Sequence, residues 1–121
     1  MTNIGIINRE LGDFIESIEN SNQALIIQKE INDLQGKSIT LESIGNTYKA
    51  IGYFSEAVDA YEESLEIAKS LKDLEGECSI LANLGASYVQ LEDFDKAISY
   101  YQESWDIAKK IANSNLKCNR F

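Results

Sequence analysis

Hydrophobic residues recur in this chain with a period of 40, and the segments align without a gap from end to end. Within each period they follow the three- and four-residue spacing of two helices joined by a short turn. The register predicts an all-α chain with a single domain, residues 1–121. We place its three helical hairpins at about residues 1–35, 36–75 and 76–114. Matched positions include Ile4-Gly5, Ile44-Gly45 and Leu84-Gly85; Phe14, Phe54 and Phe94; and Ile27, Ile67 and Ile107.

A short turn is predicted in the middle of each repeat, because the two apolar stripes are separated by only a few residues. In the first repeat, Asp13 and Glu16 have the spacing of a capping box. At the other end of the chain, residues 115–121 are either the start of a fourth repeat's first helix or a frayed terminus. The three predicted turns are Leu11-Gly12-Asp13, Ile51-Gly52-Tyr53 and Leu91-Glu92-Asp93.

The third period contains a motif that resembles a known repeat family. Leu81-x-x-Leu84-Gly85-x-x-Tyr88, followed by Phe94, Ala97 and Tyr101, resembles the tetratricopeptide repeat. The resemblance implies a right-handed superhelical solenoid of helix-turn-helix hairpins. In its 40-residue period and its absence of proline, the chain is similar to kinesin light chain-type repeats. The first repeat departs from the pattern, since Asn8 and Ser17 replace its tyrosine and alanine.

Composition argues against catalysis and against nucleic acid or membrane partners. The chain has no histidine, so histidine-based acid–base catalysis and His-bearing zinc sites are excluded. Its glycines are scattered rather than grouped in a phosphate-binding loop. With a net charge of -9 it repels nucleic acid and anionic membranes. We therefore predict a cytoplasmic, non-enzymatic protein without metal or cofactor, whose two cysteines, Cys78 and Cys118, are reduced thiols.

The candidate site is a strip along the first helix of each repeat, which in the resembled family lines the concave wall. Only two of the 20 acidic residues lie on this strip, at positions 10 and 42. Asn46 and Asn83 offer planar amides that suit the main chain of a bound peptide, and Arg9 and Lys49 suit its acidic side chains. The predicted partner-binding residues are Ile6, Arg9, Ile39, Glu42, Asn46, Lys49, Ser79, Asn83, Ala86 and Gln90.

Two functions fit this pattern. The favoured one is a scaffold or adaptor module that binds a peptide segment of another protein in the concave groove. The alternative is a structural unit, or an excerpt of a longer array, whose main contacts are between repeats or copies. Either the chain is an excerpt of a longer array, or copies stack end to end, with Leu116 and Phe121 packing at the first hairpin of a neighbour.

Overall fold

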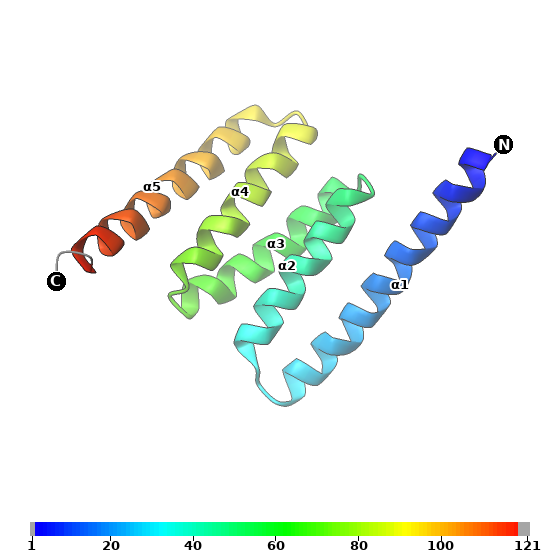
Figure 1. Cartoon of the computed structure of the whole chain (residues 1–121), viewed down its shortest axis with the longest axis horizontal. Helices are drawn as coiled ribbons and strands as arrows, with labels where there is room; N and C mark the ends of the chain where they lie inside the picture. Colours follow the sequence, from blue (N-terminus) through cyan, green and yellow to red (C-terminus); the bar gives the residue numbers. More distant parts are fainter. Residues whose placement is uncertain (1, 119–121) are drawn as a thin grey trace.

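The computed structural model describes the backbone of residues 2–118 and the side chains of residues 11–114. This part of the chain consists of α-helices and contains no strand, which confirms the all-α prediction. The helices lie side by side in chain order, with α1 at one end and α5 at the other (Figure 1). Their bounds are α1 Thr2–Glu30, α2 Leu34–Ala50, α3 Phe54–Ser70, α4 Leu74–Gln90 and α5 Phe94–Cys118.

The hairpins α2/α3 and α4/α5 close at the predicted positions. Gly52 has φ 86° and Glu92 has φ 62°, so each turn contains one residue in the left-handed region. The Gly52 N–H donates to the Lys49 carbonyl at 3.1 Å, and the Tyr53 N–H donates to the Tyr48 carbonyl at 2.9 Å. These bonds use carbonyl groups that the end of α2 leaves unpaired. The turns predicted at 51–53 and 91–93 are confirmed.

Aspartates cap the helices that begin the second and third repeats. The Asp33 side chain accepts a hydrogen bond from the Gly36 N–H at 2.9 Å, and Asp73 accepts one from Gly76 at 3.1 Å. A Cβ at Gly36 would lie 2.2 Å from the Asp33 carboxylate, so a side chain there would force the capping carboxylate to move. Both helices start two residues before the repeat boundaries expected from the sequence.

The prediction of a turn at Leu11-Gly12-Asp13 was wrong. Helix α1 is continuous through these residues, and the predicted capping residues Asp13 and Glu16 lie inside it. In the other repeats, closing the hairpin packs a large tyrosine against the first helix, as Tyr61 packs against Gly45. The matching residue in α1 is Ser21, so closure buries less apolar surface there. A straight helix instead keeps its backbone hydrogen bonds across Gly12.

Helix α5 also extends further than its counterpart α3. It runs to Cys118 with no turn at Ile111–Asn113, the position that matches the turn at residues 71–73. Residues 115–118 therefore continue α5 rather than starting a fourth first helix, contrary to one of the two expectations for this segment. The side chains of Leu116 and Phe121, on which the end-to-end stacking prediction depends, lie outside the described residues.

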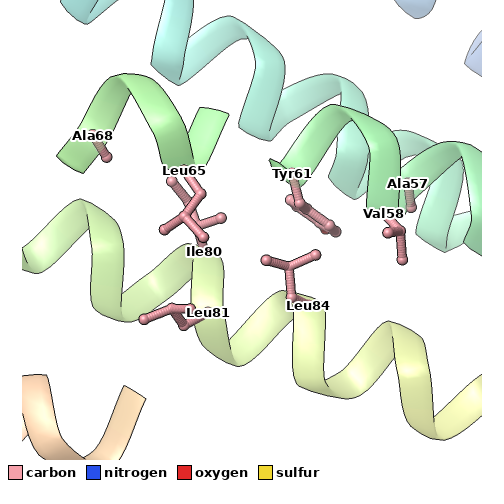
Figure 2. Packing of buried hydrophobic residues seen from close by; sticks show 8 residues of the cluster. All are labelled: Ala57, Val58, Tyr61, Leu65, Ala68, Ile80, Leu81 and Leu84. Atoms are coloured by element: carbon pink, nitrogen blue, oxygen red, sulfur yellow. The ribbon is translucent and has the colours of Figure 1, made fainter. Parts of the chain in front are cut away.

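The hydrophobic core is centred between α3 and α4. Figure 2 shows Leu65 of α3 beside Ile80 of α4, and Tyr61 facing Leu84. Tyr61, Leu81 and Leu84 are completely buried. Because α4 covers the apolar stripe of α3, the second and third hairpins form one continuous core. The buried cluster consists of Ala57, Val58, Tyr61, Leu65, Ala68, Ile80, Leu81 and Leu84.

Matched polar contacts hold each hairpin together. In the second repeat, the Ser64 hydroxyl donates to the Ser38 carbonyl at 2.7 Å. In the third, the Ser104 hydroxyl donates to the Cys78 carbonyl at 3.0 Å. Cys78 is a free thiol that occupies the position of Ser38, where a small side chain is needed between two helices. The side chain of Cys118 lies outside the described residues.

Candidate functional site

The predicted strip is present on α2 and α4, whose side chains meet across the repeat boundary. We call it the α2–α4 strip. Its two first-repeat members, Ile6 and Arg9, have side chains outside the described residues. The other members are half-buried or exposed: Ile39, Glu42, Asn46 and Lys49 on α2, and Ser79, Asn83, Ala86 and Gln90 on α4.

Two hydrogen bonds join the helices across this strip. Lys49 Nζ donates to Asn83 Oδ1 at 2.9 Å. The Ser79 hydroxyl donates to Glu42 Oε2, also at 2.9 Å. Neither pairing follows from the 40-residue register, because the partners occupy different positions within their repeats. The strip is thus a connected polar surface rather than a set of independent solvated side chains.

Asn46 has a structural role that the sequence analysis missed. The hydroxyl of the buried Tyr61 donates to Asn46 Oδ1 at 2.5 Å. This contact supplies the hydrogen-bond partner that a buried hydroxyl requires. The NH₂ group of Asn46 makes no hydrogen bond within the described residues and is the part of this amide that a peptide carbonyl can contact. In the sequence, Tyr61 itself indicates such a contact, because the hydroxyl of a tyrosine in a core needs a polar residue within hydrogen-bond distance.

The strip has surplus hydrogen-bond donors. A lysine amine can donate only, so it contacts the oxygen of Asn83 and leaves the amide NH₂ directed elsewhere. Within the described residues, the NH₂ groups of Asn46 and Asn83 make no hydrogen bond, and Lys49 uses one of its donors. Among the described residues, the carboxylate on the strip is Glu42, which already accepts from Ser79. Such a surface suits ligand groups that accept hydrogen bonds, namely backbone carbonyls and carboxylates.

The environment of Tyr61 raises its pKa from the ordinary value of 10.0 to about 12. Burial is the main cause, because the phenolate loses hydration, and the negative charge of Glu42 adds to the effect. The folded chain therefore holds this proton more tightly than the unfolded chain does. The hydroxyl stays a donor to Asn46 at neutral pH.

Alkaline pH is expected to destabilise the protein, with part of the loss traceable to Tyr61. Its contribution to the free energy of unfolding is complete below pH 10.0 and is lost as the pH rises towards about 12. Urea midpoints measured across this window should fall less steeply for Tyr61→Phe than for the native chain. Tyr53→Phe, which alters an exposed tyrosine, serves as control. Identical pH profiles for Tyr61→Phe and the native chain would contradict this assignment.

A hollow in the described residues borders the strip, and Ile39 belongs to both. It has a volume of about 550 Å³ and lies between α1 and α2. Sequence reasoning did not identify it, because the prediction of a turn at residues 11–13 placed a helix over this region. Its lining residues are Asp13, Glu16, Ser17, Asn20, Ser21, Ala24, Ile39, Thr40 and Ser43.

The comparisons with known proteins agree with a helical repeat. The family model described as Tetratricopeptide repeat matches residues 1–70 and 57–110. A search of curated proteins found no match. None of the helices in residues 2–118 is long and apolar enough to cross a membrane. The matched segments together span most of the chain, and the chain therefore belongs to the tetratricopeptide repeat family.

Proposed function

We propose that the α2–α4 strip binds a short peptide segment of a partner protein, with Lys49 and Asn83 as its main polar contacts. Tetratricopeptide repeats are generally protein–protein interaction modules. The observation that carries the proposal is the 2.9 Å hydrogen bond from Lys49 to Asn83. It fixes a cation and an amide in one place on the surface, so less side-chain entropy is lost when a ligand binds.

The chemistry of the strip defines the peptide. Amide NH₂ groups on Asn46 and Asn83 complement main-chain carbonyls, and the Lys49 ammonium complements an acidic side chain. Ile39 is exposed at one end of the strip and Val89 near the other, so both can contact apolar side chains. The peptide is therefore extended or helical, with at least one acidic residue between apolar ones. A highly acidic peptide is disfavoured because the protein carries a net charge of -9.

A peptide display screen followed by titration tests this function. Peptides selected on the native protein should bind Lys49→Ala with roughly 10- to 100-fold lower affinity, since a charge-assisted hydrogen bond contributes about 1.5–3 kcal/mol. Asn83→Ala should weaken binding less, because a neutral hydrogen bond contributes about 0.5–1.5 kcal/mol. Binding is measured by fluorescence anisotropy with a labelled peptide.

Lys69→Ala is the matched control, because Lys69 is an exposed lysine outside the strip. It removes the same charge and should leave the affinity within about twofold. Equal losses in Lys49→Ala and Lys69→Ala would indicate only general electrostatic attraction. Unchanged binding by Lys49→Ala would place the peptide elsewhere on the protein. A screen that enriches no peptide contradicts the proposal.

A further inference from the structure

The hollow between α1 and α2 lies where the first helix of repeat one would lie if that repeat matched the second one. In the second repeat, α2 covers the face of α3 that carries Ala57, which is completely buried. The residue of α1 at the matching position is Ser17, which is exposed and lines the hollow. Ala24 is half-buried, whereas its counterpart Ser64 is completely buried. The hollow is thus the place where the first helix of repeat one would lie.

Residues 2–11 have the sequence of that helix. They carry the aliphatic residue and glycine that recur as Ile44-Gly45 in α2 and Leu84-Gly85 in α4, and the family match begins at residue 1. The structure nevertheless joins them to residues 13–30 in one straight helix. Of the described helices, α1 packs against α2 alone, and its amino-terminal part extends away from the hairpins (Figure 1). A segment held in this way cannot turn back into its own groove.

We propose that two copies of the chain exchange residues 2–11, so that each copy's segment fills the α1–α2 groove of the other. The intact hairpins define the register, because Gly45 faces Tyr61 and Gly85 faces Tyr101. The same offset places residue 5 opposite residue 21, now in the second copy. The two α1 helices then run antiparallel, and because residues 5 and 21 are equally far from residue 13, the two-fold axis passes near Asp13, next to Gly12. A Cβ at Gly12 would meet no atom within 4 Å, so this point is open to a second helix.

The exchange continues an interface that the chain already uses twice, at α2/α3 and α4/α5. In the dimer, each exchanged segment packs against residues 13–30 of the other copy, which adds two helix–helix contacts. Both α1 helices keep their backbone hydrogen bonds across Gly12. The exchanged segment is neutral overall, because Arg9 and Glu10 are its only charged residues, so it adds no net charge to a groove bordered by Asp13 and Glu16. The second copy also brings its residues 6 and 9, the predicted first-repeat members of the strip, next to α2.

Analytical ultracentrifugation tests the dimer without reference to any peptide ligand. The mass should rise from 13.6 kDa towards twice that value as the concentration increases from low micromolar to several hundred micromolar. Ser17→Arg fills the groove and repels Arg9, so the dimer dissociation constant should rise by at least roughly tenfold. Ser99→Arg, on an exposed position of α5, is the matched control and should behave as the native chain. A monomer at every concentration, or equal effects of the two variants, overturns the proposal.

Thiol cross-linking separates exchange from a hairpin closed within one chain. Cysteines are introduced by Gly5→Cys and Ser21→Cys, after Cys78→Ser and Cys118→Ser remove the native thiols. A short bismaleimide should join two chains into a covalent dimer on a denaturing gel, and each single-cysteine variant should give no such band. A cross-link within one chain, or none in a variant that circular dichroism shows to be folded, overturns the proposal.

Discussion

Tyr61→Ala is expected to lower the free energy of unfolding by about 3–5 kcal/mol, the range for removing a buried aromatic side chain. Tyr61 is completely buried between α2, α3 and α4, and its hydroxyl bonds to Asn46. The substitution opens a cavity in the largest core cluster and leaves no side chain to fill it. Total stabilities of domains are about 5–15 kcal/mol, so this single change removes a large part of the total.

Tyr101→Ala is the matched comparison, because Tyr101 has the same repeat position but is 42% exposed. No described helix covers that face of α5, so the ring buries less area and its loss should cost clearly less. Urea denaturation followed by circular dichroism measures both variants. Equal shifts in the midpoint would mean that the outer face of α5 is covered in solution, for instance by another copy of the chain.

Gly45→Leu is expected to have the second largest effect, with a loss of about 1–3 kcal/mol or more from overpacking. A Cβ at Gly45 would already lie 2.7 Å from Cε1 of Tyr61, and that ring is enclosed on all sides. A leucine therefore forces α2 away from α3. The helix propensity of leucine exceeds that of glycine, but only by about 1 kcal/mol, so the steric cost prevails.

Gly85→Leu tests the same crossing in the third repeat and should cost less. A Cβ there would lie 3.0 Å from the ring of Tyr101, which can move outwards because it is partly exposed. Glu103→Leu, on the exposed face of α5, should leave the urea midpoint nearly unchanged. The expected order of destabilisation is Gly45, Gly85 and then Glu103. A different order in the denaturation curves would contradict the assigned helix faces.

Much of the architecture follows from the sequence alone. The 40-residue period identifies the helices, the turns at 51–53 and 91–93 and the tight crossings at Gly45 and Gly85, because each depends on local spacing and side-chain size. It also placed Asn46, Lys49 and Asn83 on one strip, since residues on one helix face are fixed by helical geometry. The kinesin light chain-type subclass, by contrast, stays a prediction.

Only the tertiary structure decided whether a local turn signal is used and which polar side chains meet. Gly12 and Asp13 are as suitable for a turn as the residues at 52–53, yet α1 is straight there. A turn is stable when the helices that it joins bury enough apolar surface, and Ser21 provides less than Tyr61 does. Likewise, the Lys49–Asn83 and Ser79–Glu42 bonds depend on how closely α2 and α4 approach. Such distances are set by the packing of the whole repeat against its neighbours, which no local pattern encodes.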